Sequence, residues 1–254
     1  MIVKMEDPGK AERLFKGWQE AMILSCLQGV MGAVYGDAPE NPKSAAAILG
    51  DFCLFAGQPD PELVRFRPES STKFRILVPG NEAWGRLIEA CFGSSAKKIE
   101  RYAIRKEAGG FSKEHLQAAA DSLKTGYSMR IIDRELYEKC GENDWSRDLV
   151  SQFNSYARYR DLGLGMAVLK GDLLVSGASS YARYREGIEI EIDTREEYRG
   201  QGLAYACGAG LILECLKRGL YPSWDAHDRR SVALAEKLGY HLDHGYTAYE
   251  VWDL

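Results

Sequence analysis

The chain has 254 residues, a length that suits either one large domain or two domains of ordinary size. Apolar residues make up 45% and charged residues 28%, which supports buried cores and excludes a disordered chain. The formal net charge of -4 argues against a broad nucleic-acid interface, because neutralising phosphates requires clustered Lys and Arg. We therefore expect two globular domains and no nucleic-acid partner.

The sequence contains no stretch that predicts a membrane span or a secretory signal. Its longest apolar stretches, such as residues 21–27, are far shorter than the ~20 residues that a spanning helix needs. Lys4, Glu6 and Asp7 interrupt the start of the chain, where a signal peptide would be apolar. The six cysteines are scattered without a C-x-x-C pair, as is typical of reduced thiols. These features predict a cytoplasmic protein without a membrane partner.

The first half of the chain predicts a smaller α+β domain, assigned to residues 1–125. Its expected elements are a helix over 10–28, strands over 31–35 and 45–55, a strand over 74–78, a helix over 82–92 and a strand over 98–104. A helix capped by Ser112 follows, and we place the domain junction in or just after it. No catalytic motif is evident in this half.

The second half, residues 126–254, predicts a second α+β domain in the order β-α-α-β-β-β-α-β-α-β-β. Strands over 165–169, 173–184 and 188–193 are joined by tight turns, which indicates an antiparallel meander. A helix over 203–218, a strand over 223–226, a helix over 229–238 and a last strand pair complete the domain. His241 and His244 would point to opposite faces of a strand, so no metal site is expected.

The segment Ile188-Glu189-Ile190-Glu191-Ile192-Asp193 alternates strictly between aliphatic and acidic side chains. A strand with this pattern buries one face and carries three carboxylates on the other. Taken alone, this pattern favours a solvated sheet face with Lys or Arg across the strand. The residues that follow favour a functional site.

Arg199-Gly200-Gln201-Gly202-Leu203-Ala204 forms a glycine-rich turn between this strand and the next helix. Such a turn leaves backbone N–H groups at the positive end of the helix dipole, where they bind anions. Gly200 and Gly202 let phosphate oxygens approach the main chain, and Arg199 adds charge, so a diphosphate suits the turn. The P-loop and Rossmann motifs do not fit, because Leu203 replaces the Lys of the first and Tyr205 the third Gly or Ala of the second.

At these residues the chain resembles the GNAT superfamily of N-acetyltransferases. Arg199, Gly202 and Ala204 match the signature Arg/Gln-x-x-Gly-x-Gly/Ala, and residues 231–240, with Ser231 and Gly239-Tyr240, are similar to the superfamily's Asn-x-x-Ser/Ala…Leu-Gly-Phe helix. The whole chain looks like the longer GNAT acetyltransferases with an extra N-terminal region, such as the zwittermicin-resistance-like proteins. Element order alone allows the N-terminal half to be a degenerate copy of the same fold.

The resemblance implies a GNAT fold in the second half, with a mixed, largely antiparallel, splayed sheet flanked by helices. It also implies transfer of an acetyl group from acetyl-coenzyme A to the amine of a small molecule by direct attack, with no metal. The pantetheine arm would lie in the gap between the strands on either side of the glycine helix, hydrogen-bonded like an added strand. The resemblance leaves the identity of the acceptor and the oligomeric state open.

The resemblance assigns roles to individual residues. The cofactor-binding candidates lie at the end of the acidic strand, in the glycine turn and at the start of the last helix: Ile192, Asp193, Thr194, Arg199, Gly200, Gln201, Gly202, Leu203, Ala204, Asp228 and Ser231. Glu191 is the first candidate for the general base and Glu189 the second, because Glu191 lies nearer the gap. The family's usual Tyr acid is replaced by Ala235, which leaves Tyr240, Tyr246, Tyr249 or water, with Tyr240 taken as the candidate.

Two departures from the family pattern support an alternative function. Asp228 stands where the family has Asn, and Ala235 cannot donate a proton. The second hypothesis is therefore a domain that binds acyl-coenzyme A without catalysis, as a sensor or interaction module. A plain structural module is the third possibility, and it would place no ligand in the strand gap.

Overall fold

The computed structural model describes residues 1–69, 73–107 and 109–252. The chain divides into two compact units, which we call unit 1 (Met1–Tyr102 with His244–Leu254) and unit 2 (Ala103–Asp243). Each unit mixes helices with a strand-rich core, which confirms the predicted α+β class.

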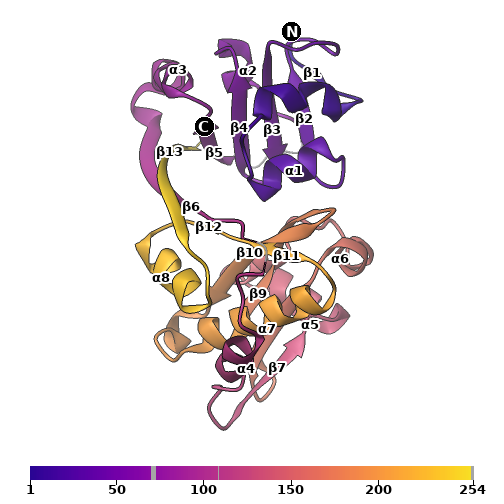
Figure 1. Ribbon diagram of the computed structural model, residues 1–254, viewed down its shortest axis with the longest axis vertical. Helices are drawn as coiled ribbons and strands as arrows, with labels where there is room; N and C mark the ends of the chain where they lie inside the picture. Colours follow the sequence, from indigo (N-terminus) through magenta and orange to yellow (C-terminus); the bar gives the residue numbers. More distant parts are fainter. Residues whose placement is uncertain (70–72, 108, 253–254) are drawn as a thin grey trace. The chain divides into compact units, whose positions relative to one another are not determined.

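The division differs from the boundary expected at residues 125 and 126. The C-terminal strand β13 (Leu242–Trp252) runs antiparallel to β5 (Phe74–Pro79), so residues from the end of the chain complete the sheet of unit 1. Helix α4 (Lys113–Ala120) packs on α7 (Leu203–Lys217) and belongs to unit 2. Figure 1 shows β13 beside β6 (Ala96–Ile104), the two strands that continue from one unit into the other.

The other elements of unit 1 begin where the sequence supplies local caps. Asp7 caps the 3-10 helix η1 and Asn81 caps α3 through its Oδ1, which accepts the N–H groups of Ala83 and Trp84. In chain order these elements are β1 (Val3–Lys4), η1 (Pro8–Phe15), α1 (Ala21–Leu27), β2 (Ala33–Gly36), β3 (Ser44–Leu49), β4 (Phe52–Gly57), α2 (Pro61–Arg65), α3 (Glu82–Phe92) and η2 (Gly93–Ser95).

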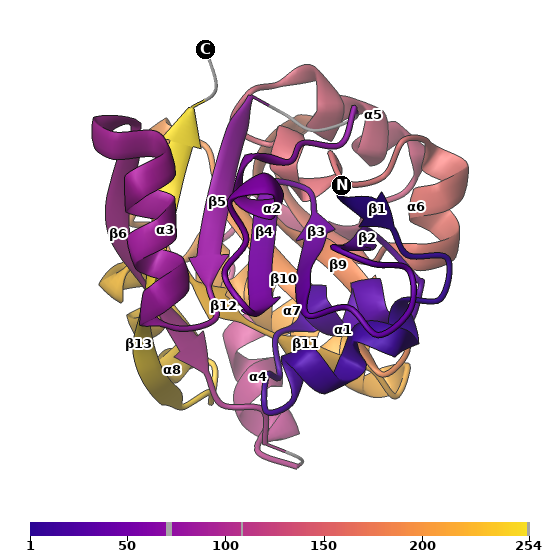
Figure 2. The same ribbon diagram turned by 90° about the horizontal axis from the view of Figure 1, so that it is seen from above.

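The strands of unit 1 follow the order β1-β2-β3-β4-β5, with β13 and β6 beyond β5. Neighbours from β1 to β4 are antiparallel, whereas β4 and β5 are parallel. Figure 2 shows β3, β4 and β5 side by side, with α3 beyond β5. Trp84 of α3 anchors the core, since its ring stacks on Phe55 at 5.0 Å and its Nε1 donates to Gly57 O at 3.0 Å.

Unit 2 is built on strands of similar length to those expected. Its remaining elements are β7 (Tyr127–Ile131), α5 (Arg134–Glu142), η3 (Arg147–Leu149), α6 (Tyr156–Leu162), β8 (Gly165–Lys170), β9 (Leu173–Tyr184), β10 (Gly187–Thr194), η4 (Glu196–Tyr198), β11 (Tyr221–Ser223), β12 (Asp225–Ala226) and α8 (Arg229–Lys237). Within the described residues, β7-β8-β9-β10-β11 form a five-stranded sheet, antiparallel up to β10 and parallel between β10 and β11.

Helices cover both faces of this sheet. A Cβ added to Gly210 of α7 would lie 2.8 Å from Met129 Sδ, so glycine lets the helix approach β7 closely. On the opposite face, Gly177 faces Leu149 of η3 and Gly165 faces Tyr159 of α6. The sheet of unit 2 is thus the middle layer of three.

The two units share one strand order. In each, the first four strands are antiparallel neighbours and the fifth is parallel to the fourth. Helical segments follow the first strand, a helix joins the fourth to the fifth, and another helix follows the fifth. The two units therefore have corresponding strands that can be compared one by one.

Three expected elements are corrected by the structure. The helix over 10–28 is interrupted at Gly17, whose φ of 93° is incompatible with a continuous helix, and becomes η1 and α1. The strand over 45–55 turns back at Gly50, with φ 56°, and becomes the hairpin of β3 and β4. The last strand pair is one long strand, β13, whose partners lie in the first half of the chain.

Among the described residues, every helix is too short or too polar to span a bilayer.

Trp84 and Trp252 offer a matched test of where unit 1 is stabilised. Trp84 is 0% exposed and Trp252 is 65% exposed. We expect Trp84→Ala to lower the free energy of unfolding by about 3–5 kcal/mol, since it leaves a large cavity. Trp252→Ala should change it by less than about 0.5 kcal/mol, as exposed substitutions do. Urea titrations followed by circular dichroism would measure both, and similar losses for the two variants would contradict this core.

Candidate functional site

The parallel strands β10 and β11 separate after three residue pairs. Gly187, Ile188 and Glu189 pair with residues 221–223, and β10 then continues to Thr194 with β9 as its strand partner. β11 ends at Ser223, and the following β12 adjoins β6 in the sheet order. The backbone of residues 190–194 therefore faces an opening, where an extended ligand can pair as an added strand.

Glu189 lies where the strands separate. Its side chain is 5% exposed, and its Oε1 accepts the backbone N–H of Asp225 at 2.6 Å. The pairing of β10 with β9 shifts register between Glu189 and Ile190, which leaves Tyr181 as an extra residue on β9. The carboxylate thus secures the first residue of β12 at the apex of the opening.

Glu191 and Ile192 occupy opposite faces of β10. Glu191 lies across from Ser179, whose Oγ is 2.9 Å from the Tyr159 hydroxyl, so it shares the face covered by α6. Ile192 points to α7, where its Cδ1 lies 3.0 Å from the position of a Cβ on Gly208. Glu191 is half-buried, whereas Glu189 is almost fully buried.

The glycine turn has the conformation that its sequence predicts. Gly200 and Gly202 adopt φ values of 74° and 82°, and a Cβ at either position would meet no atom within 4 Å. Gly202 is the N-cap of α7 and supplies no side-chain hydrogen bond, whereas Asp133 and Ser155 cap α5 and α6. The first-turn N–H groups of α7, which begins Leu203-Ala204, are thus not capped by a side chain and suit an anion.

Polar side chains fix the shape of this turn. Arg199 Nε donates to Thr194 O at 3.0 Å, and its Nη2 lies 3.8 Å from Asp193 Oδ1. Gln201 Oε1 accepts the Tyr127 hydroxyl at 2.8 Å. Burial raises the pKa of Asp193, while the Thr194 N–H and Arg199 oppose that rise. These contacts join the end of β10 to the start of α7.

Asp228 and Ser231 organise the start of α8. Asp228 Oδ1 accepts the Ser231 N–H at 2.9 Å, and Oδ2 accepts Arg230 Nη2 at 2.7 Å. Burial favours a higher pKa for Asp228, but the Ser231 N–H and Arg230 hold it below its ordinary value. Ser231 Oγ accepts Trp224 Nε1 at 3.0 Å. Both side chains are therefore engaged within the protein, and their contact with a cofactor stays a prediction.

The candidate acid Tyr240 is buried at 3% exposure, and its hydroxyl donates to Pro222 O at 2.7 Å. Burial raises its pKa well above the ordinary value. The hydroxyl proton is thus used by β11 in this structure. The alternatives Tyr246 and Tyr249 belong to unit 1.

Lys106 is a residue of this region that the sequence did not single out. Its Nζ lies 4.2 Å from the ring centroid of Tyr184 and 5.5 Å from that of Tyr221. The Tyr221 hydroxyl accepts Glu107 N–H at 2.9 Å and donates to Arg105 O at 3.3 Å, which fixes the main chain on both sides of Lys106. These residues are far apart in the sequence, so no local motif could have identified them.

Burial and nearby charges shift the pKa of Lys106 in opposite directions. Burial between the rings lowers its pKa, and the carboxylates of Glu186 and Glu189 partly oppose that shift. Tyr184 and Tyr221 each pair with Gly187, two residues before Glu189 on the same face of β10. Lys106 therefore supplies positive charge to the region of the apex.

The structure brings the predicted residues into two groups. Glu189, Glu191, Ile192, Asp193 and Thr194 follow one another along β10, and the glycine turn continues directly from them. The second group follows β12 in the chain: Asp228 caps α8, Ser231 lies in its first turn and Tyr240 follows it. The arrangement can hold an extended, diphosphate-bearing molecule whose reactive end reaches a carboxylate.

Comparisons with known proteins cover most of the chain. The family model described as GNAT acetyltransferase matches residues 12–249. The uncharacterised N-acetyltransferase YdfB of Bacillus subtilis is 29% identical over 233 residues, covering 87% of this chain and 86% of that protein. The crystal structure of a GCN5-related N-acetyltransferase-like protein from Streptococcus suis has a TM-score of 0.91 and 49% identity, covering 97% of this chain and 98% of the other.

A more distant structure has the same fold. A tandem GNAT protein from the clavulanic acid biosynthesis pathway has a TM-score of 0.55 at 10% identity, covering 99% of this chain and 98% of the other. These matches confirm the GNAT fold predicted for the chain. They do not distinguish the zwittermicin-resistance-like subtype.

The environment of Lys106 predicts a coupled titration. Glu189→Gln removes a carboxylate that favours the ammonium form, so we expect the pKa of Lys106 to fall further below its ordinary value. Reductive ¹³C-methylation of the lysines followed by an NMR pH titration would measure it, with Lys237 as an exposed reference. An unchanged or raised Lys106 pKa in the variant would contradict this electrostatic coupling.

Proposed function

Because the chain belongs to the GNAT acetyltransferase family and is an N-acetyltransferase, we propose that unit 2 transfers an acetyl group from acetyl-coenzyme A to the amine of a small molecule. The observation that carries this proposal is the opening between β10 and β11, which runs directly into the uncapped N-terminus of α7. A strand opening offers backbone pairing to a pantetheine arm, and the helix terminus offers N–H groups to a pyrophosphate.

The residues of β10 and the glycine turn fit the donor molecule. Its pyrophosphate would be bound by the backbone of residues 200–204, since side chains are absent at Gly200 and Gly202. The exposed guanidinium of Arg199 adds positive charge beside that backbone. Its arm would follow the main chain of Ile192, Asp193 and Thr194 towards Glu189. Acetyl-coenzyme A supplies the activated acyl group, and the protein supplies its orientation.

Glu191 is our choice for the group that deprotonates the attacking amine. Glu189 already accepts the Asp225 N–H through Oε1 and is almost fully buried. Glu191 is half-buried on the face of β10 opposite α7. Because Glu191 is less buried than Glu189, it is the carboxylate that an amine can approach, as a general base requires.

We propose that unit 1 is a degenerate copy of unit 2 that binds no coenzyme A. Its parallel strands β4 and β5 stay paired from Phe52 with Ile76 to Phe55 with Pro79, at the end of β5, so the equivalent opening is closed. The helix that follows β4 has five residues, and Asp60 caps it by accepting Glu62 N–H at 2.8 Å. Two carboxylates at this terminus would repel a phosphate.

One observation favours acyl-coenzyme A binding without catalysis as the second candidate. Ala235 is fully buried in α8, and the nearby Tyr240 hydroxyl is bonded to Pro222 O. No tyrosine of α8 can therefore protonate a departing thiolate. In the catalytic case the proton would have to come from water or from a tyrosine outside α8, and turnover with any amine decides between the two functions.

Calorimetric titration with acetyl-coenzyme A tests the cofactor site. We expect about one molecule bound per chain in the micromolar range, and a loss of roughly tenfold or more in affinity for Gly202→Asp, whose carboxylate would face the phosphates. Gly219→Asp is the matched control, since Gly219 also has a positive φ, of 68°, but lies after the other end of α7. No binding by the wild type, or equal loss in both variants, would refute the site.

Acetyl transfer across an amine panel tests the role of Glu191. We expect Glu191→Gln to lower turnover by about 10²-fold or more while leaving acetyl-coenzyme A affinity nearly unchanged, because a general base acts only on the amine. Glu189→Gln serves for comparison and should also disturb the apex of the opening. Full activity of Glu191→Gln would remove it from this role.

A further inference from the structure

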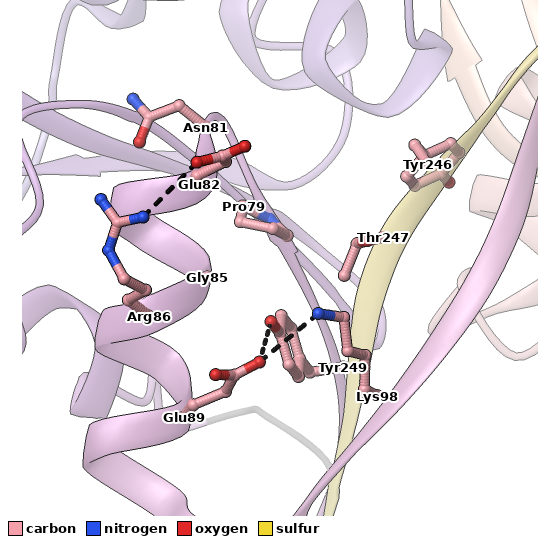
Figure 3. Close-up of a pocket in the computed structure, with 10 residues that line it drawn as sticks. All are labelled: Pro79, Asn81, Glu82, Gly85, Arg86, Glu89, Lys98, Tyr246, Thr247 and Tyr249. Carbon is pink, nitrogen blue, oxygen red and sulfur yellow. Dashed lines mark hydrogen bonds and ion pairs between the residues drawn. The ribbon is translucent and has the colours of Figure 1, made fainter.

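Unit 1 contains a cavity of about 430 Å³ that lies outside the proposed acetyl-transfer site. Its walls come from α3, from β13, from Lys98 of β6 and from the end of β5, all within unit 1. The size falls in the range of about 300–1,000 Å³ that is typical of small-ligand sites. Figure 3 shows its side chains around the space between α3 and β13.

The cavity lies where β5 and β13 stop pairing. Their last matched residues in this direction are Leu77 and Tyr249, although β5 continues to Pro79 and β13 begins at Leu242. Gly85 of α3 faces this place, and a Cβ there would lie 3.1 Å from the Tyr249 hydroxyl. Strand separation and a glycine on the helix together create the space.

A carboxylate and an ammonium group lie together beside this space. Glu89 Oε1 accepts the Tyr249 hydroxyl at 2.7 Å and lies 3.6 Å from Lys98 Nζ. Figure 3 shows both interactions meeting at the same oxygen of Glu89. Lys98 Nζ is also 5.9 Å from the ring centroid of Tyr249. Glu89 and Lys98 are therefore adjacent, and both lie against the buried Tyr249.

Glu89 and Tyr249 each have one protonation state near neutral pH. The Tyr249 hydroxyl, and then the charge of Lys98, hold the pKa of Glu89 below its ordinary value, so Glu89 is an anion. Burial raises the pKa of Tyr249 to about 12, so its hydroxyl keeps its proton and donates it to Glu89. The lone pairs of the Tyr249 oxygen can then accept from a ligand, and Lys98 has further N–H groups to donate.

We propose that this cavity binds a small α-amino acid in its zwitterionic form. The ligand ammonium would lie against Glu89 and the Tyr249 oxygen, and the ligand carboxylate against Lys98. The two charges of an α-amino acid are held on one carbon, so they match a protein pair whose charged atoms are 3.6 Å apart. A ligand with only one charge would engage only one member of this ion pair and compete with the other.

The remaining wall suits a ligand side chain of modest size. Pro79, Thr247 and Tyr246 line the cavity on the side of β5 and β13, as Figure 3 shows. They offer apolar surface and hydroxyl groups around the charged pair. Because Glu89 and Lys98 are 50% and 62% exposed, solvent competes for both charges, and we expect affinities in the millimolar range.

Amide chemical shifts of the full-length ¹⁵N-labelled protein test this site. The probes are glycine, L-alanine, L-serine, L-glutamate and L-lysine, with ethanolamine lacking the carboxylate and N-acetylglycine lacking the ammonium group. We expect saturable shifts at Gly85 and Thr247 with at least one amino acid below about 10 mM, and shifts at least several-fold weaker with the two truncated probes.

Variants of the charged pair supply the decisive comparison. Glu89→Gln and Lys98→Met should each weaken binding by roughly tenfold, as expected when a charged hydrogen-bond partner is removed. Lys97→Met is the matched control, because Lys97 is the adjacent residue of β6, points to the other face and pairs with Glu250. Amide spectra would verify the fold of each variant.

Three results would overturn the proposal: no saturable shift with any amino acid, equal binding of ethanolamine or N-acetylglycine, or the same affinity in Glu89→Gln and Lys98→Met as in the wild type. None of these readouts depends on acetyl transfer. Failure here would therefore leave the proposed function of unit 2 unaffected.

Discussion

The hydrogen bond from the Asp225 N–H to Glu189 Oε1 lies at the point where the two parallel strands of unit 2 separate, and it fixes β12 there. Parallel strands tend to stay paired, since each unpaired backbone group in a sheet must find another partner. Here a side chain replaces the next backbone acceptor, and the register shift between Glu189 and Ile190 turns β10 away at the same place. The opening therefore begins where the Glu189 carboxylate, rather than a backbone carbonyl of β10, accepts the Asp225 N–H.

The comparison between the two units supports that interpretation. Both have the same strand order, and both place the fifth strand parallel to the fourth. In unit 1 no charged residue occupies the pairing region of β4, where Leu54 faces Val78 and Phe55 faces Pro79, and the strands remain together. In unit 2 an acidic residue occupies every second position of β10, and the strands part at the first of them. One fold thus gives a closed and an open version of the same strand pair.

Local sequence patterns predicted the parts of this site that depend on neighbours in the chain. The alternation of Glu and Ile gave the strand, and Gly200 and Gly202 indicated the turn whose positive φ values the structure shows. Ser112 was equally predictable as a helix cap, since a cap acts within three residues. These features have short-range physical causes, so one sequence suffices to find them.

Features built from distant segments could not be predicted in this way. Nothing in residues 242–252 indicates that this strand joins β5, because its alternating pattern would suit any sheet edge. Lys106 gained its surroundings only when Tyr184 of β9 and Tyr221 of β11 came to lie on either side of β10. Even Tyr240, chosen for its place after α8, has its hydroxyl directed by the carbonyl of Pro222 on another strand. Long-range pairing, rather than composition, decides the role of such residues.

The position of β13 explains why the two units separate at different strand pairs. By entering between β5 and β6 it adds Tyr249 and Val251 to the core of unit 1 and fills the place next to the fifth strand. The strand pair that separates in unit 1 is consequently β5 with β13, whereas in unit 2 it is β10 with β11. Each separation is lined by a glutamate whose carboxylate is held through Oε1, Glu89 in one and Glu189 in the other. The same strand order therefore separates at a different strand pair in each unit.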